Sequence, residues 1–246
     1  PEYHFVSDFD VFHSMWVVSN SKHVERFKLL FNEKVKTSYI ADGHHRAASA
    51  SRVSKLLAEA NPKHKGDEAY NYLLTCLFPS NQLKIYDYNR VVKDLNGLSE
   101  EELINRVKEK FELNEIKQQE YTPANFHEIG MYLSGKWFQL FPKKKTFTDD
   151  PIGRLDVTIL QQNILSPILG IEDPRIDKRI DFFAGTKGLS AIEKRVNKGK
   201  AAVAFALYPV SMQQLFDVSD TGGIMPPKST WFEPKLLSGL IISSFK

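Results

Sequence analysis

Disulfide-forming cysteines and long hydrophobic runs are both missing from this chain of 246 residues. Its single cysteine, Cys76, excludes a disulfide framework, and its place in the apolar run NYLLTCLFP predicts a buried, inert thiol. No apolar stretch approaches the ~20 residues that cross a bilayer, so no membrane attachment is expected. A basic and then apolar leader is also missing, which makes the cytoplasm the expected location.

An excess of charge of one sign is missing as well. The 33 basic and 30 acidic residues leave a net charge of +3. Nucleic-acid binding usually shows a clustered basic face, so nucleic acid is not an expected partner. The apolar content of 42% and the charged content of 26% are typical of a globular protein. The chain begins at Pro1 without a methionine, which suggests a processed product or a piece of a longer protein.

What the chain does contain is an alternation of strand and helix patterns, which predicts an α/β or α+β fold: a mixed β-sheet with flanking helices. The expected strands are 14–19, 37–41, 71–78, 83–92, 136–141, 179–185, 201–209 and 239–245. The expected helices are 21–31, 43–60, one from 99, 122–135, 156–169 and one from 190. The strand at 71–78 is expected to be buried, and alternation over 83–92 predicts an exposed or edge strand.

A boundary is expected at Asn96-Gly97, which divides the chain into parts 1–97 and 98–246. The two parts could also pack as one domain. Two helices are expected to begin with capping boxes, formed by Ser99 with Glu102 and by Ser190 with Glu193.

The stretch SYIADGHHRAASA places an acid, a glycine, two histidines and an arginine at the expected start of the helix 43–60. We call residues 42–46 the DGHHR turn. A helix N-terminus carries unpaired N–H groups and a partial positive charge, and glycine lets an anion approach the backbone closely. Arg46 could add a bidentate contact to phosphate, with His44 and His45 as further donors. The pattern therefore favours phosphate binding by Gly43, His44, His45 and Arg46.

Asp42 allows several interpretations. As a plain N-cap its carboxylate would accept the N–H bonds that a phosphate needs, and the histidines would then be surface residues. If an anion binds, Asp42 must turn elsewhere, and it could act as a general base on a substrate hydroxyl. Metal binding by Asp42, His44 and His45 is disfavoured, because adjacent histidines on a helix diverge whereas ligands usually stand at i and i+4. No metal site is therefore expected.

Three segments of the chain resemble one known family. YIADGHHRAASA resembles the signature of the domain of unknown function 1015, a bacterial and archaeal family. GGIMPPKSTWFEPKLLSGL resembles the family's second hallmark, and HSMWVV resembles the segment before the first. Family members are longer at the N-terminus, so the chain resembles their C-terminal part.

At the DGHHR turn the family is similar to the ParB/sulfiredoxin superfamily, in which such a turn binds nucleotide phosphates. The resemblance implies a ParB/sulfiredoxin-like element here, a nucleotide or phosphorylated small molecule as ligand, and ATP or ADP with Mg²⁺ as cofactor. It implies a phosphotransferase, such as a small-molecule kinase similar to the free-serine kinases, with Asp42 as catalytic residue. The alternatives are a non-catalytic nucleotide-binding regulatory module and a ParB-like DNA-partitioning protein. Sulfiredoxin chemistry would need a cysteine in the turn, and the turn has none. The oligomeric state is left open.

A second candidate site is the segment GGIMPPKSTWFEPKL (222–236), which we call the hallmark loop. Its glycines and prolines and its lack of periodicity predict a loop. Lys228, Ser229 and Thr230 could contact a phosphate. The alternative is a proline-braced connection in which Trp231 and Phe232 pack into the core. The Walker spacing G-x-x-x-x-G-K-[ST] is absent.

Overall fold

The structure is a computed structural model that describes residues 1–7, 10–117 and 121–244. The chain divides into two compact units, Pro1–Ile40 and Ala41–Lys246. Within the described residues, every helix is too short or too polar to span a bilayer.

Among its described residues, the first unit contains a pair of strands and one helix. Strands β1 (Tyr3–Val6) and β2 (Phe12–Met15) pair antiparallel, and α1 covers Ser21–Lys34. The Asn20 side chain begins α1 by accepting the N–H groups of Lys22 and His23. The predicted helix at 21–31 is confirmed, whereas the strand predicted at 14–19 ends at Met15.

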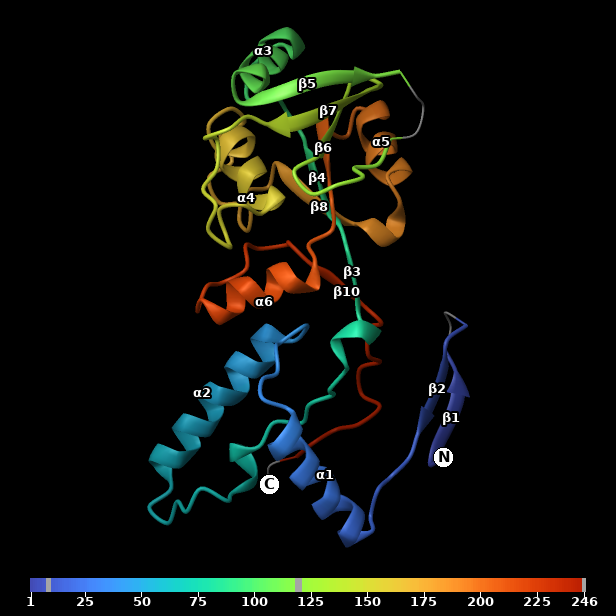
Figure 1. The fold of residues 1–246 in the computed structure, drawn as a ribbon, viewed down its shortest axis with the longest axis vertical. Coiled ribbons are helices and arrows are strands. Elements are labelled where there is room, and N and C mark those ends of the chain that lie inside the picture. The colour runs from blue at the N-terminus through green and yellow to red at the C-terminus, as the bar shows by residue number, and fades with distance from the viewer. Residues whose placement is uncertain (8–9, 118–120, 245–246) are drawn as a thin grey trace. The chain divides into compact units, whose positions relative to one another are not determined.

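The second unit is built around a six-stranded sheet in the order β5-β7-β6-β9-β4-β8 (Figure 1), and all its pairs are antiparallel. Its strands are β4 (Tyr88–Val92), β5 (Phe111–Ile116), β6 (Ile129–Leu133), β7 (Lys136–Pro142), β8 (Ile180–Ala184) and β9 (Val203–Leu207). The helices are α2 (His44–Ala60), α3 (Glu100–Lys110), α4 (Asp156–Leu160, continued by a π-helical turn Gln161–Leu165), α5 (Ser190–Asn197) and α6 (Met212–Asp220). A separate two-stranded sheet pairs β3 (Lys84–Tyr86) with β10 (Trp231–Glu233). The α+β class is therefore confirmed.

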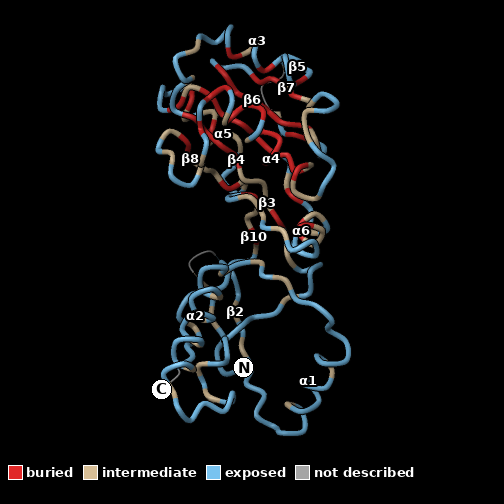
Figure 2. The backbone as a smooth tube through the Cα atoms, turned by 90° about the vertical axis from the view of Figure 1, so that its left-hand side faces the viewer, coloured by how far each residue is buried: buried red, intermediate tan, exposed pale blue. Residues whose placement is uncertain are grey.

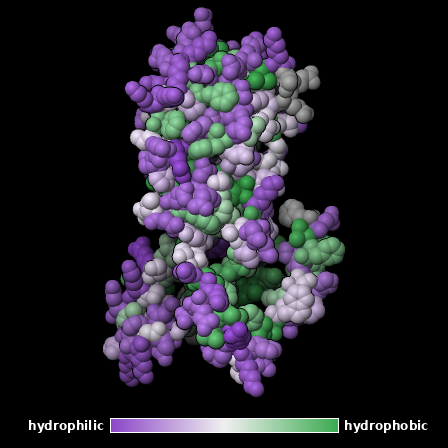
Figure 3. All heavy atoms as spheres, viewed as in Figure 1, coloured by the Kyte–Doolittle hydropathy of each residue, from purple (hydrophilic) through white to green (hydrophobic). Residues whose placement is uncertain are grey.

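Both faces of the six-stranded sheet are covered, which explains the apolar sequence of β9. Val203, Phe205 and Leu207 face the core formed with α3 and α4, and Ala204 and Ala206 face the smaller core under α5. Successive residues of a strand point to opposite faces, so a strand buried on both reads as a continuous apolar run. Figure 2 shows the buried residues gathered in this sheet body, and Figure 3 shows a mainly hydrophilic surface around it.

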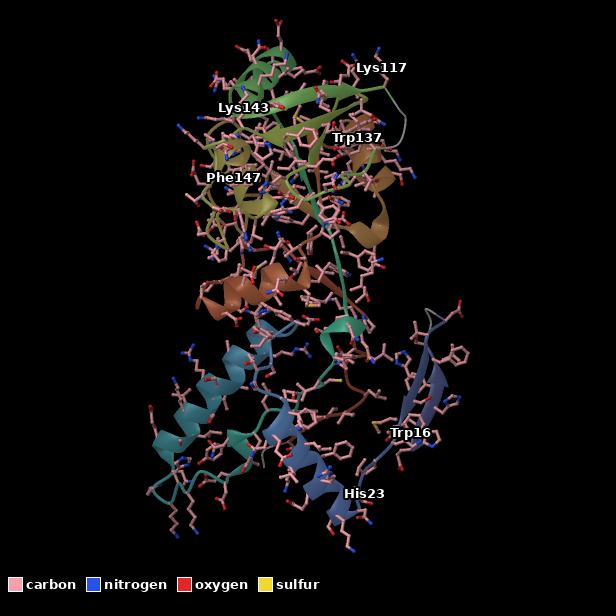
Figure 4. The ribbon with its side chains drawn as sticks, viewed as in Figure 1. Trp16, His23, Lys117, Trp137, Lys143 and Phe147 are labelled. Carbon is pink, nitrogen blue, oxygen red and sulfur yellow. The ribbon has the colours of Figure 1, made fainter. Side chains whose placement is uncertain are left out.

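Trp137 of β7, which is labelled in Figure 4, connects the sheet to α5. Its indole Nε1 donates to Glu193 Oε1 at 2.8 Å. The predicted capping box of Ser190 with Glu193 is wrong. The N-cap of α5 is Leu189, no side chain caps the helix, and the Glu193 carboxylate accepts the Trp137 indole N–H instead. The capping box of Ser99 and Glu102 is confirmed.

Five further predictions about strands and helices are wrong. Residues 37–41 and 71–78 contain no strand, and the apolar side chains of 72–77, with Cys76, are exposed. The helix predicted at 122–135 is replaced by β6, which lies between β7 and β9. β4 is an interior strand and not an edge, because β8 and β9 flank it. The last predicted strand is also absent over 239–244, and its residue 245 lies outside the described residues.

The sheet joins residues on both sides of Asn96-Gly97. β4 precedes this point, and its partners β8 and β9 follow it. The division into 1–97 and 98–246 stays a prediction. The predicted helix at 156–169 is confirmed as α4 and its π-helical turn, and the strands predicted at 136–141, 179–185 and 201–209 are confirmed as β7, β8 and β9.

Candidate functional site

The DGHHR turn forms the start of α2, and Gly43 is its N-cap with a left-handed φ of +83°. Glycine adopts this conformation without a steric penalty. The helix runs from His44 to Ala60, as predicted, and the Ala47 N–H donates to the Gly43 carbonyl at 2.9 Å. No side chain caps the helix, and the N–H groups of a helix's first turn have no intrahelical partner.

The guanidinium of Arg46 folds back over the N-terminus of its own helix. A Cβ built on Gly43 would lie 3.0 Å from both Nε and Nη2 of Arg46. Only a residue without a Cβ leaves this position to the arginine undisturbed. His44, His45 and Arg46 are all exposed. The turn therefore presents a guanidinium and two imidazoles to solvent beside a helix start that no side chain caps.

Asp42 takes none of the usual N-cap bonds. Its Oδ1 accepts the N–H of Gly43 at 2.7 Å, and its Oδ2 accepts Nζ of Lys235 at 3.2 Å. Partial burial by itself would raise the pKa of Asp42, but the hydrogen bonds from Lys235 and Gly43 and the charges of Lys235 and Arg46 hold the pKa below its ordinary value. Asp42 is thus an ionised carboxylate at neutral pH.

The sequence did not single out Lys235 as a site residue. It belongs to the hallmark loop, and its ammonium lies 4.9 Å from the ring centroid of Trp231. Glu233 accepts both the Trp231 indole N–H at 2.8 Å and the Lys235 backbone N–H at 3.0 Å. These contacts hold Lys235 at Asp42. The position of Lys235 in a segment that resembles a family hallmark could have indicated a site residue. Its pairing with Asp42 could not be predicted, because 193 positions separate the two residues in the sequence.

The three hallmark-loop residues that the sequence proposed as phosphate contacts are Lys228, Ser229 and Thr230, and two of them make contacts within the protein. Ser229 is buried and its hydroxyl donates to the carbonyl of Pro226. The carbonyl of Lys228 accepts Nη2 of Arg90 at 3.0 Å, while its exposed ammonium lies 5.7 Å from the Tyr88 ring centroid. Thr230 is half-buried. Phe232 is buried in the core, as the proline-braced alternative expects, whereas Trp231 is only half-buried.

Arg90 is a further residue that the sequence did not reveal. It is almost fully buried, and its guanidinium donates to the carbonyls of Tyr88 and Lys228. Burial lowers the pKa of Arg90 to about 9, opposed by the charge of Tyr88. Arg90 thereby fixes the backbone of the hallmark loop at Lys228, whose φ of +55° is left-handed. No group of three or more metal-ligating side chains occurs among the described residues.

Comparison with known proteins places the chain in a family. Residues 1–158 match the family described as "Protein of unknown function (DUF1015)", and the chain belongs to this family. No curated protein matches the chain.

Several solved structures are similar to the chain. Free serine kinase in complex with AMP has 18% identity and a TM-score of 0.45 over 88% of this chain and 81% of that one. A conserved hypothetical protein from Pyrococcus furiosus has 17% identity and a TM-score of 0.43 over 86% and 82%. A variant of free serine kinase in complex with ADP has 19% identity and a TM-score of 0.43 over 89% and 82%. With TM-scores below 0.5, the functional proposal rests on the chain's own residues.

Proposed function

We propose that the chain binds a nucleotide, or another phosphorylated ligand, at the start of α2. The supporting observation is the uncapped helix N-terminus at Gly43 with the Arg46 guanidinium folded over it. Backbone N–H groups and the helix dipole favour an anion at this position, and a guanidinium matches phosphate oxygens bidentately. The N–H groups of His44, His45 and Arg46 would bind phosphate oxygens, with the imidazoles as additional donors.

Lys235 extends this phosphate site. Its ammonium is paired with the ionised Asp42 and is partly exposed. A phosphate on the adjacent N–H groups would compete with Asp42 for the ammonium, since both are anions. If the Lys235 ammonium moved from Asp42 to the phosphate, the Asp42 carboxylate would be left without its ion-pair partner beside the ligand.

We further propose phosphoryl transfer to a small hydroxyl compound, of the kind that a serine-like kinase performs. Asp42 would remove the proton from the substrate hydroxyl, whose oxygen then forms a bond to the terminal phosphorus. The bond between that phosphorus and the bridging oxygen breaks, and the nucleotide product leaves with the electron pair. ATP or ADP would be the phosphoryl donor. Mg²⁺, if bound with the nucleotide, would neutralise phosphate charge; Asp42 is the carboxylate of the turn available to it.

A non-catalytic nucleotide-binding module is the second candidate, and the Asp42–Lys235 pair is the observation that favours it. A carboxylate held by an ammonium is a poor base, so the pair could simply report ligand binding by opening. Phosphate transfer from labelled ATP or ADP to a mixture of small hydroxyl metabolites separates the two functions. Nucleotide binding without transfer would support the module.

Arg46→Ala tests the binding site itself. We expect it to weaken nucleotide or inorganic phosphate binding by about 1.5–3 kcal/mol, the range for hydrogen bonds to charged groups. The matched control is Arg52→Ala, which removes the same charge from an exposed position of the same helix and should leave affinity nearly unchanged. Calorimetric titration measures both. Equal affinities of the two variants would refute a phosphate site at the DGHHR turn, as would loss of folding with residual phosphate affinity intact.

A further inference from the structure

The two-stranded sheet of β3 and β10 has one buried face and one accessible face. Phe232 pairs directly with Ile85, and both side chains are buried. Successive residues of a strand point to opposite faces, so Trp231 and Tyr86, which pair directly with each other, lie on the other face. Both of them are half-buried. The accessible face of this small sheet therefore carries two adjacent aromatic side chains.

Contacts within the protein fix the orientation of the Trp231 ring. Its indole N–H donates to Glu233 Oε1 at 2.8 Å, so the polar edge of the ring has a partner. Tyr88 packs against the ring edge-on, with the two ring centroids 5.8 Å apart. A ring that is already oriented loses little conformational freedom when a ligand stacks on it, which favours binding.

The Lys235 ammonium connects this ring to the proposed phosphate site. Its Nζ lies 4.9 Å from the Trp231 ring centroid and 3.2 Å from Oδ2 of Asp42. The ring therefore borders the start of α2. The group over the ring is the end of a flexible side chain that is 37% exposed, so a ligand that draws the ammonium away would uncover the ring.

A nucleotide matches this combination of a phosphate site and a neighbouring aromatic ring. In a nucleotide one ribose separates the base from the first phosphate, so the base lies beside the group that holds the phosphate. Bases stack on aromatic side chains such as tryptophan and tyrosine. A phosphorylated sugar or inorganic phosphate has no group that could use the ring of Trp231.

We infer that Trp231, with Tyr86 beside it, stacks the base of a nucleotide whose phosphate binds at the start of α2. The inference rests on the proposed phosphate site and narrows the ligand of that site to the nucleotide class. Every base has a π-face, so stacking selects nucleotides as a class and does not select one base.

The test titrates the full chain with ADP and with pyrophosphate, which has the phosphates without the base. The ratio of the two affinities isolates the effect of the base. Trp231→Leu should lower this ratio by roughly 5- to 150-fold, the range for stacking of one base on an aromatic ring. Trp231→Phe keeps a ring and should retain most of the ratio. The matched control is Tyr72→Leu, which removes an exposed ring from the same unit and should leave the ratio unchanged.

A second readout does not depend on the folding of Trp231→Leu. In the wild type saturated with ADP, nuclear Overhauser effects should connect the base protons to the Trp231 ring protons, and Trp231→Phe identifies this indole among the three of the chain. If Trp231 only holds Lys235 in place, Trp231→Leu lowers both affinities by the same factor. That unchanged ratio, or the lack of Overhauser effects in the ADP complex, would overturn the stacking and leave the phosphate site intact. Failure of both probes to bind the wild type would refute the phosphate site, and this inference with it.

Discussion

Nζ of Lys235 lies 3.2 Å from Oδ2 of Asp42, which connects the hallmark loop near the C-terminus to the DGHHR turn. The lysine is held in place by its neighbours Trp231 and Glu233, and the carboxylate by the N–H of Gly43. The two segments that resemble family signatures therefore meet through a pair of opposite charges. The charged groups of Asp42 and Lys235 lie at the start of α2, where we propose phosphate binding.

Replacement of Lys235 by glutamine should raise the pKa of Asp42. Burial raises this pKa and the lysine lowers it, so the direction follows from removing the lowering charge. NMR titration of the Asp42 carboxyl measures the change. Lys55→Gln, an exposed substitution in α2, is the control and should leave the pKa as in the wild type. An unchanged pKa in Lys235→Gln would show that the pair does not persist in solution.

The same pair has a small effect on stability. The folded-state pKa of Asp42 is below the unfolded value of 3.8, so its contribution is present above pH 3.8 and is lost as pH falls through the folded pKa. Both partners are substantially exposed, which limits the pair to ~0.2–1 kcal/mol. Chemical unfolding at neutral pH should therefore show a loss of at most this size for Lys235→Gln.

Gly43→Ala should reduce phosphate affinity by displacing Arg46. The new Cβ would lie 3.0 Å from the guanidinium, and the flexible side chain can move away. Backbone strain at φ +83° should also cost ~1 kcal/mol of stability. Gly66→Ala is the matched control, because Gly66 has a φ of +95° and a Cβ there would meet nothing within 4 Å. Phosphate titration of both variants distinguishes the two effects; equal loss of affinity would contradict a role for Arg46.

Asp156 should make the protein less stable as pH rises. Its folded pKa of about 8 exceeds the ordinary 3.8, so the folded state holds a proton that the unfolded state has lost. The free energy of unfolding should therefore fall between about pH 4 and pH 8. Asp156→Asn should lose this dependence and be more stable than the wild type above pH 8. Denaturant unfolding across this range measures it, with Asp149→Asn expected to behave as the wild type. A slope retained in Asp156→Asn would assign the dependence to another group.

The two serines of the expected capping boxes should behave differently. Ser99 accepts the Glu102 N–H at 3.2 Å and the Glu102 carboxylate accepts the Ser99 N–H at 2.7 Å, so Ser99→Ala should cost ~1 kcal/mol. Ser190 is exposed and makes no cap, so Ser190→Ala should change stability by less than ~0.5 kcal/mol. Thermal unfolding of both variants provides the comparison. Similar costs for the two substitutions would contradict the assignment of the caps.

Local chemistry explains what the sequence predicted correctly. The helix 43–60 begins with glycine and ends at Asn61-Pro62, and α3 begins with a reciprocal cap, so nearby residues settle both boundaries. The same signals made α6 predictable, because Ser211 and Gln214 form a capping box that went unrecognised. The position of the DGHHR turn at the start of this helix was also predicted correctly, whereas phosphate binding by the turn stays a prediction.

Tertiary structure decided what depends on distant partners. The run 71–78 is as apolar as a buried strand, but burial requires neighbours that the sequence does not name, and its side chains are exposed. Thr122-Pro123 has the pattern of a helix start, yet pairing with β7 and β9 makes 129–133 a strand. The partner of Asp42 was equally hidden, because a charge reveals its need for a counter-charge and not where along the chain that counter-charge lies. Asp156 shows the same limit: its residue type is plain in the sequence, but its pKa is set by burial, which only the packed fold creates.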